Sequence, residues 1–530
     1  MEDKKSQFLG GNKLFIYVLL LIIGYWIGGV EKKSKISFSE LGDKIINVIN
    51  PKSNSANAKI NAILNLIDKH YVDTLNASDF EDKTINAILN ELDPHSAYIP
   101  VKKYQAVEED MQGSFSGIGV QFNIIDDSIV VISAISGGPS EKLGIQSGDR
   151  IVSVEKEDVA STGIKNEDVI KLLRGVKGSI VSINIKRRGQ KELMAFDITR
   201  DDIPLYSVDV GIMLKDNIGY LKINRFAATT YQEMMEKVSL LQEVGMNKLI
   251  LDLRGNPGGY LHIANQMCDE FLKDGELIVF TEGRNRPKEK IFATQNGQLE
   301  NIKVIVLINE GSASASEIVS GALQDNDRGK IIGRRSFGKG LVQEQISLQD
   351  GSVIRLTTQR YYTPSGRCIQ KDYGKNEKDY YLEQYTRKDT TTSYSDSLTY
   401  TTKNGRTVYG GGGITPDIII KRDSTANYLQ INRMISKGWL NEFCLKQSEQ
   451  LKKKNIKSHK EIDKDIIYAQ YKVFVTKKEN NFKLKLGNTE LKYFSNLLKA
   501  TTCLNLWDND IYYSVLSAED AYIQRAINEF

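Results

Sequence analysis

Apolar residues recur at a helical or a strand period along most of the chain, and the period changes between regions. Helical spacing covers 58–71 and 79–92, and it returns after 427. Short strands with glycine turns cover 115–199. Beyond 205, strands alternate with helices: strands at 218–223, 248–253, 276–281 and 304–308, helices at 229–244 and 261–272. A further strand is predicted to start at 330–333 and to continue at 341–348. This order predicts a multidomain α/β chain whose largely parallel sheet has its functional loops at the carboxyl ends of the strands.

One stretch, residues 304–343, combines the strongest signals. A buried strand at 304–308 is followed by the small-residue turn GSASAS at 311–316, and a helix is predicted to begin near Ala315. This geometry raises a side chain into a cleft and points helix N–H groups at it. Lys339 follows in the run FGKG, with Gln343 four residues on. A serine at a helix start and a lysine on a constrained loop suggest a Ser-Lys hydrolase.

The lysine can act as a base only when it is neutral. Its ordinary pKa of about 10.4 must therefore fall by roughly 3 units, which burial can cause. Phe337 and the neighbouring glycines offer such burial, and the charges of Arg334 and Arg335 act in the same direction.

Three serines, Ser312, Ser314 and Ser316, compete for the role of nucleophile. All three could cap the helix, and Ser314 with Glu317 fits a capping box. The residues alone leave this choice open.

An oxyanion hole could be formed by the N–H of Ala315 and an N–H in the turn at Gly258 and Gly259. Glycines let a substrate carbonyl approach closely. The alternative is that this glycine pair only makes a strand-to-helix turn.

Composition argues against several classes of protein. The 530 residues are too many for one compact domain, and a net charge of +4 without a basic stripe argues against nucleic acid as a partner. The four cysteines form no CxxC pair and the histidines number only four, so we predict no metal site and no cofactor. His95 is interpreted as a turn residue, and His262 as a packed or rim residue.

The N-terminus carries an apolar stretch at 14–30, which has no charged residue and is flanked by lysines. No small-residue cleavage site follows it, so it predicts an uncleaved signal anchor. We therefore expect a membrane-anchored protein with its bulk extracytoplasmic, in the periplasm.

Residues 115–199 resemble a PDZ domain. They contain a glycine-rich loop ahead of a strand, the pattern GxxxGDxIxxV at 144–154 and a closing helix. The resemblance implies that a peptide C-terminus binds by strand addition, with its carboxylate held by N–H groups of Gly117, Ile118, Gly119 and Val120.

Five motifs together resemble the carboxyl-terminal processing peptidases, the tail-specific serine proteases of peptidase family S41. They are LRGNPGG at 253–259, GSASASE at 311–317, FGKG at 337–340, TPSGR at 363–367 and GGITPD at 412–417. The resemblance implies a crotonase-like (ClpP/crotonase) α/β protease core with an inserted PDZ domain and helical N- and C-terminal regions. Cys368 departs from the family pattern, and residues 372–408 and 427–530 lie outside it; the former are interpreted as an exposed insertion.

Site roles follow from that resemblance. Ser314 is implied as the nucleophile, Lys339 as the general base and Gln343 as the residue that orients the lysine. Ala315 with Gly258 or Gly259 would form the oxyanion hole, and Ser312 and Ser316 would support the turn.

The predicted domains follow the changes of pattern. They are a cytoplasmic tail and signal anchor at 1–34, a helical region at 35–105, the PDZ domain at 106–200, the α/β serine protease core at 201–422 and a helical extension at 423–530.

The resulting functional prediction is a serine endopeptidase that recognises unstructured C-terminal tails of cell-envelope proteins and cleaves them through an acyl-enzyme. Arg174, where the closing PDZ helix meets a glycine, is a candidate link between tail binding and the core. A homodimer or an adaptor protein stays open as a further partner. The alternatives are a catalytically inactive PDZ scaffold on a crotonase-like frame and an acyl-CoA enzyme, which would leave the PDZ domain unexplained.

Overall fold

The computed structural model describes residues 56–135, 137–294, 297–374, 376–387, 398–422, 427–479, 482 and 484–530. The chain divides into two units, Met1–Glu81 and Asp82–Phe530. The described part of the first unit contains α3 (Ala56–His70), which leaves Ile63 and Leu66 about half exposed. Helix α4 (Ala77–Asn90) runs across the division.

The main sheet of the second unit has the strand order β10-β11-β12-β15-β16-β21. Its neighbours are parallel except for the antiparallel pair β10 and β11. This agrees with the predicted parallel layer. The strands are β10 (Val208–Met213), β11 (Ile218–Ile223), β12 (Lys248–Asp252), β15 (Lys303–Ile308), β16 (Gly329–Gly333) and β21 (Ile418–Ile419).

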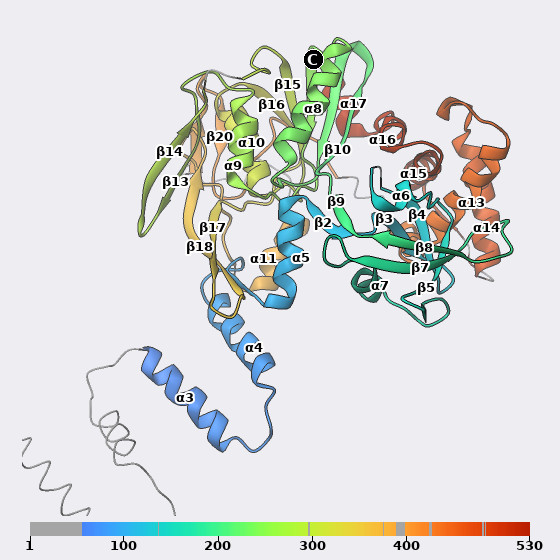
Figure 1. Ribbon diagram of the computed structural model, residues 1–530. Helices are drawn as coiled ribbons and strands as arrows, with labels where there is room; N and C mark the ends of the chain where they lie inside the picture. Colours follow the sequence, from blue (N-terminus) through green and yellow to red (C-terminus); the bar gives the residue numbers. More distant parts are fainter. Residues whose placement is uncertain are drawn as a thin grey trace, which may run out of the picture. The chain divides into compact units, whose positions relative to one another are not determined.

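Both faces of this sheet are covered, which explains why its strands are nearly continuous apolar runs. Side chains alternate along β12: Leu249 and Leu251 join one core, and Ile250 joins another on the opposite face. The first core includes residues of α8 (Thr230–Glu243), α9 (Leu261–Asp269) and α10 (Ala315–Asp325). The second includes residues of α16 (Asn509–Ser517) and α17 (Ala521–Ile527). Figure 1 shows α8, α9 and α10 in green beside the sheet and α16 and α17 in red.

A second sheet has the order β1-β18-β13-β14, with β17 also paired to β18. The prediction that residues 341–348 continue the strand of β16 is wrong, because among the described strands β17 pairs with β18 alone. The chain leaves the first sheet at Gly333, whose φ of +143° favours glycine. Strand β14 was not predicted, because nearly all its side chains are exposed and show no apolar alternation. The strands are β1 (Ala97–Ile99), β13 (Leu277–Gly283), β14 (Arg286–Phe292), β17 (Leu341–Ser347) and β18 (Val353–Tyr362).

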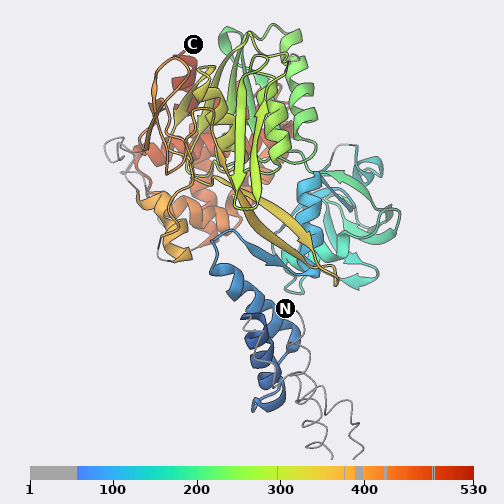
Figure 2. The ribbon, with the colours of Figure 1, turned by 90° about the vertical axis from the view of Figure 1, so that its left-hand side faces the viewer.

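The PDZ region follows α5 (Val101–Gln112) and is held at its base by the strand pair β2 and β9. Its sheet has the order β3-β4-β5-β7-β8, so β3 is an edge strand. Figure 2 shows this region in cyan and teal. The elements are β2 (Ser114–Gly117), β3 (Val120–Ile124), β4 (Ile129–Ala134), α6 (Pro139–Lys142), β5 (Arg150–Val154), β6 (Glu157–Asp158), α7 (Asn166–Leu173), β7 (Ile180–Lys186), β8 (Met194–Thr199) and β9 (Asp201–Pro204).

The segment interpreted as an exposed insertion is partly built into the protein. Helix α11 (Glu377–Thr386) buries Tyr380, which is 1% exposed, against Phe337 and Ala313. The tyrosine-rich composition suggested a surface loop, but tyrosine also packs well when its hydroxyl finds a partner. Residues 388–397 lie outside the described part, and β19 (Thr399–Thr401) and β20 (Thr407–Tyr409) form a hairpin.

The chain after 427 is helical and has its own apolar core, which includes Tyr471, Phe494 and Leu498. This core brings together α12 (Leu429–Ser436), α13 (Trp439–Lys453), α14 (Lys464–Lys478) and α15 (Asn488–Leu506).

The predicted membrane location is corrected. Among the described residues, none of the helices combines the length and the apolar character needed to span a bilayer. The stretch at 14–30, on which the signal anchor was predicted, lies outside the described residues. The membrane-anchored, periplasmic location is therefore withdrawn.

Candidate active site

Ser314 lies where β15 gives way to α10, at the carboxyl end of the parallel sheet. It caps the helix with φ 55° and ψ −114°. A positive φ is uncommon for serine, and strained backbone of this kind is concentrated at functional sites. Ser314 is partly exposed, whereas its neighbours Ala313 and Ala315 are buried. The sharp turn thus leaves the Ser314 side chain accessible at the carboxyl edge of the sheet.

The two flanking serines are fully buried and bind the neighbouring turn. Ser312 Oγ donates to the carbonyl of Leu253 at 2.8 Å. Ser316 Oγ donates to the carbonyl of Asn256 at 2.9 Å. Both therefore fasten the turn at 253–259 to the start of α10, which fits supporting roles.

Lys339 points its ammonium group at Gln343. Lys339 Nζ donates to Gln343 Oε1 at 2.8 Å, and Gln343 Nε2 donates to the carbonyl of His95 at 2.7 Å. The amide of Gln343 is thus fixed at both ends, and its oxygen faces the lysine. Sequence reasoning expected His95 to be a turn residue, and its carbonyl supports the residue that orients Lys339.

Burial, followed by the charge of Arg355, lowers the pKa of Lys339 from its ordinary value to about 8. Asp93 and Glu317 act in the opposite direction. The neutral form that a base requires is therefore far easier to reach near pH 7 than for an ordinary lysine.

Glu317 joins the serine turn (residues 309–314) to the lysine loop (residues 334–340). The sequence did not reveal this role. Its side chain is 0% exposed. One carboxylate oxygen accepts from Ser314 N–H at 2.8 Å and Lys339 N–H at 2.9 Å. The other accepts from Ser336 Oγ at 2.5 Å and Gly338 N–H at 2.7 Å. The predicted capping box contained Glu317, but only the fold brings the lysine loop against the same carboxylate.

A buried tyrosine reinforces this connection. Tyr361, on β18, directs its hydroxyl at the carbonyls of Lys339, at 2.8 Å, and Ser314, at 3.1 Å. Burial raises the pKa of Tyr361 well above its ordinary value, so the hydroxyl keeps its proton. The backbones of the two loops are therefore held from two sides.

The glycine turn lies directly against the serine. A Cβ added to Gly258 would lie 2.8 Å from Ser314 Cβ and 3.0 Å from Ala315 N. Gly259 has φ +150°, and a Cβ there would collide with the Phe226 carbonyl at 2.1 Å. Both positions thus need glycine. The N–H of Gly258 already donates to Asn256 Oδ1 at 2.9 Å, which makes Gly259 the less committed of the two donors.

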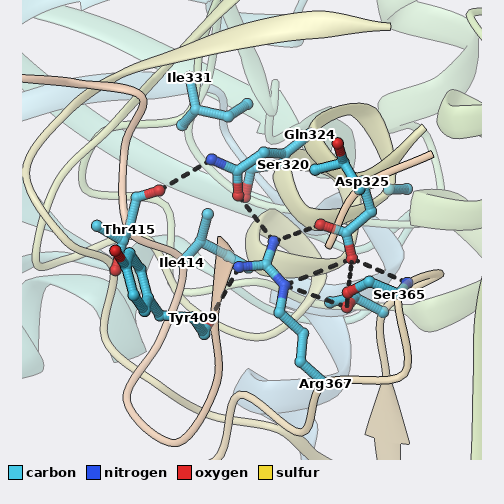
Figure 3. Close-up of polar contacts among 12 residues, drawn as sticks. Ser320, Gln324, Asp325, Ile331, Ser365, Arg367, Tyr409, Ile414 and Thr415 are labelled. Carbon is cyan, nitrogen blue, oxygen red and sulfur yellow. Dashed lines mark hydrogen bonds and ion pairs between the residues drawn. The ribbon is translucent and has the colours of Figure 1, made fainter. Parts of the chain in front are cut away.

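The far end of α10 is fixed by a buried ion pair, which gives the TPSGR motif a structural role (Figure 3). Arg367 Nη2 contacts Asp325 Oδ1 at 2.6 Å, with both side chains 0% exposed. Arg367 also donates to Gln324 Oε1 at 2.7 Å and to the Tyr409 carbonyl at 3.0 Å. Ser365 donates to Asp325 at 2.7 Å. Helix α10, which Ser314 caps at its start, is thereby held at its C-terminal end.

A second buried lysine, Lys371, lies next to the loop that carries Lys339. Its Nζ donates to the Tyr380 carbonyl at 2.7 Å and lies 4.0 Å from the centroid of the Phe337 ring. Tyr380 also contacts His95 Nε2 through its hydroxyl at 2.7 Å. Burial, followed by the charge of Lys339, lowers the pKa of His95 to about 4, so this ring is neutral at pH 7. Sequence reasoning missed this cluster because α11 was taken for an exposed insertion.

The predicted peptide-binding residues occupy the loop between β2 and the edge strand β3. Gly117 ends β2, and Val120 begins β3. Gly119 has φ +73°, and Ile118 is buried. These four residues precede the serine turn by many elements along the chain. Because β3 is an edge strand, a peptide can pair with it as an added strand.

Arg174 connects the PDZ region to the helix that precedes it. Its Nη1 contacts Glu109 Oε2 on α5 at 2.6 Å, and its guanidinium lies 4.0 Å from the centroid of the Phe115 ring. His262 is exposed and contacts Tyr260 through its ring. In the described part of the chain, three or more His, Cys, Asp or Glu side chains nowhere gather as a metal site would require.

Two family models match this chain, and similar proteins are known. The model of peptidase family S41 matches residues 217–382, and that of the PDZ domain matches residues 116–198. A carboxy-terminal-processing protease of Bartonella bacilliformis is 36% identical over 318 residues, which cover 59% of this chain and 72% of that protein. The carboxy-terminal processing protease CtpB of Bacillus subtilis is 33% identical over 316 residues, 59% of this chain and 65% of that protein. Among solved structures, the photosystem II D1 C-terminal processing protease is 24% identical with a TM-score of 0.36, covering 68% of this chain and 86% of that one.

The two family-model matches and the two carboxy-terminal processing relatives define a serine-type protease with a PDZ domain. The chain belongs to peptidase family S41, among the carboxy-terminal processing proteases.

Proposed function

We propose that this protein is a serine endopeptidase that binds unstructured C-terminal peptide tails at its PDZ domain and cleaves them with a Ser314–Lys339 dyad through an acyl-enzyme. The single observation that carries the proposal is the Glu317 carboxylate, which holds the backbones of both residues within hydrogen-bond distance of one oxygen atom. A strained serine and a buried lysine of lowered pKa are the two groups that such chemistry needs.

Recognition would begin at the PDZ domain. The tail adds as a strand to β3, and N–H groups of the loop at Gly117, Ile118, Gly119 and Val120 hold its carboxylate. That these tails belong to cell-envelope proteins stays a prediction. A second copy of the chain, or an adaptor protein, stays a prediction that the size of the complex in solution tests.

Acylation would then start from neutral Lys339. Its Nζ takes the proton from Ser314 Oγ as that oxygen bonds to the scissile carbonyl carbon. The negative oxygen of the tetrahedral intermediate accepts hydrogen bonds from the N–H of Ala315 and of Gly258 or Gly259. Collapse of the intermediate breaks the C–N bond, and the Lys339 ammonium returns its proton to the leaving amine.

Deacylation would use the same groups. Lys339, neutral again, takes a proton from a water molecule that attacks the ester carbonyl, and then gives it to Ser314 Oγ. Gln343 keeps Nζ in place throughout, because its own amide is fixed by the His95 carbonyl.

The domain boundaries stay predictions, as does the crotonase-like character of the core. The boundary at 423 falls in a segment outside the described residues.

The test compares serine variants on an unstructured protein substrate with an apolar C-terminal tail. Ser314→Ala should abolish cleavage, while Ser312→Ala and Ser316→Ala, matched in chemistry and at most two residues away, should keep measurable activity. Cleavage by Ser314→Ala at the parent's rate would refute the assignment. If the parent also fails to cleave but binds the tail, the inactive scaffold is favoured, and turnover of a CoA thioester instead would favour the acyl-CoA enzyme.

A further inference from the structure

The turn that carries Gly258 begins at an arginine held by the far C-terminal part of the chain. Arg254 Nε and Nη2 donate to the Asp252 carboxylate, Nη2 at 2.6 Å. Arg254 Nη1 donates to both oxygens of Asp520, at 3.1 and 2.9 Å. Asp520 lies well beyond residues 217–382, which match the S41 family.

Asp520 is itself fixed by the fold. It caps α17, accepting hydrogen bonds from the N–H groups of Tyr522 at 2.8 Å and Ile523 at 3.1 Å. The Tyr522 ring lies 4.6 Å from the Arg254 guanidinium. Helix α17 packs against β15 and β16 through the core that contains Ile523 and Leu307. The carboxylate is therefore a rigid partner for Arg254, with a side chain only 26% exposed.

The backbone of Arg254 transmits this restraint to the turn. Its N–H donates to Asp252 Oδ1 at 3.0 Å, and its carbonyl accepts from Lys222 Nζ at 3.1 Å. The preceding carbonyl, of Leu253, accepts from Ser312 Oγ. A shift of Arg254 would therefore move the turn that places Gly258 against Ser314.

Charge makes the second carboxylate significant. Asp252 is completely buried, and burial alone would raise its pKa, yet Arg254 and Lys222 lower the pKa to about 2. Asp252 is therefore ionised. The two carboxylates, of Asp252 and Asp520, together balance the two cations, Arg254 and Lys222. Without Asp520, Nη1 of Arg254, whose side chain is only 16% exposed, would lose its partner.

We propose that Asp520 is a positioning residue that acts through Arg254 on the oxyanion turn, residues 253–259. Helix α17 would thereby contribute to the geometry of the active site. This inference rests on the proposed function.

The test measures kcat and KM separately for the full-length chain and its variants on one tail-bearing substrate. Asp520→Asn should lower kcat about tenfold or more, because small misplacements of catalytic groups cost up to about a hundredfold, while KM stays within about twofold. Asp520→Glu, which can still reach Nη1, should recover most of the loss. Glu519→Gln is the matched control, since Glu519 pairs with Lys464 within the C-terminal helices and not with Arg254.

Each outcome decides the matter. Parent kcat in Asp520→Asn overturns the inference, as does an equal loss in Glu519→Gln or failure of Asp520→Glu to recover activity. A loss in Asp520→Asn that follows a lowered fraction of folded protein, measured by near-UV circular dichroism, also overturns it. Ser314→Ala in the same assay separates the two levels: if it cleaves like the parent, the proposed function fails; if it is inactive while Asp520→Asn is fully active, only the role of Asp520 fails.

Discussion

Glu317 and Lys339 are joined by a hydrogen bond of 2.9 Å between a buried carboxylate oxygen and a backbone N–H. The same oxygen accepts the N–H of Ser314. The relative position of nucleophile and base is therefore set by one side chain on the first turn of α10. The negative charge of Glu317 also raises the pKa of Lys339, and so opposes the lowering of that pKa by burial.

Replacing Glu317 with Gln tests this arrangement. An amide has one acceptor oxygen, so its NH2 group must face some of the four donors that the carboxylate serves. We expect kcat to fall about tenfold to a hundredfold. The lost negative charge should also move the acid limb of the kcat/KM profile to lower pH, since Lys339 deprotonates more easily. Glu344→Gln, on the surface of β17, is the control and should leave both unchanged; an unshifted acid limb in Glu317→Gln would contradict the electrostatic part.

Replacing Gln343 with Glu should move the profile the other way. A carboxylate at hydrogen-bond distance from Nζ favours the ammonium form, so the Lys339 pKa should rise by about 1 unit or more. The acid limb of kcat/KM should follow it upward. Gln345→Glu makes the same chemical change two residues along the strand, at an exposed position, and should have little effect. Equal profiles for the two variants would show that Gln343 does not contact the base.

Arg174→Ala tests the link between tail binding and the core. It removes the ion pair with Glu109 and the contact with Phe115. Cleavage of a tail-bearing substrate should fall, while the Kd of the isolated tail peptide, measured by fluorescence anisotropy, should stay unchanged. Glu109→Gln should reproduce the effect, and Arg188→Ala, an exposed arginine of the same domain, should not. Unchanged cleavage in Arg174→Ala would refute the link.

Arg367→Met tests the support of α10. It leaves the Asp325 carboxylate buried without its ion-pair partner, so the free energy of unfolding should fall by about 3–5 kcal/mol. Arg286→Met breaks the half-exposed pair with Glu344 and should leave the free energy of unfolding almost unchanged. Urea denaturation measures both, and similar losses for the two variants would contradict the structural role of the TPSGR motif.

Sequence patterns predicted the elements near the site well where burial is two-sided. The runs at β11, β12 and β15 are apolar on both faces, so their positions were clear from the sequence, and the turn at Gly258 and the start of α10 followed from them. The path after Gly333 was missed, because the change of sheet depends on long-range packing of the loop and not on local periodicity.

Local sequence patterns could not identify residues that act by bringing distant segments together. Glu317 has an obvious local role as a cap, which hides its contacts with the lysine loop. Asp520 is far from Arg254 in sequence, and nothing near it resembles a site. The polar, tyrosine-rich α11 was interpreted as exposed because composition does not reveal that Tyr380 reaches His95.

The pH dependence of kcat/KM tests the central claim, that Lys339 is the base, most directly. A tail-bearing peptide with no group that titrates between pH 6 and 10 isolates the free enzyme's ionisations. Because the neutral lysine is the active form and burial lowers its pKa to about 8, activity should rise tenfold per pH unit below that value and level off above it. The inflection should move down in Glu317→Gln and up in Gln343→Glu. A profile that is flat from pH 6 to 10, or an inflection that neither variant moves, would contradict the account.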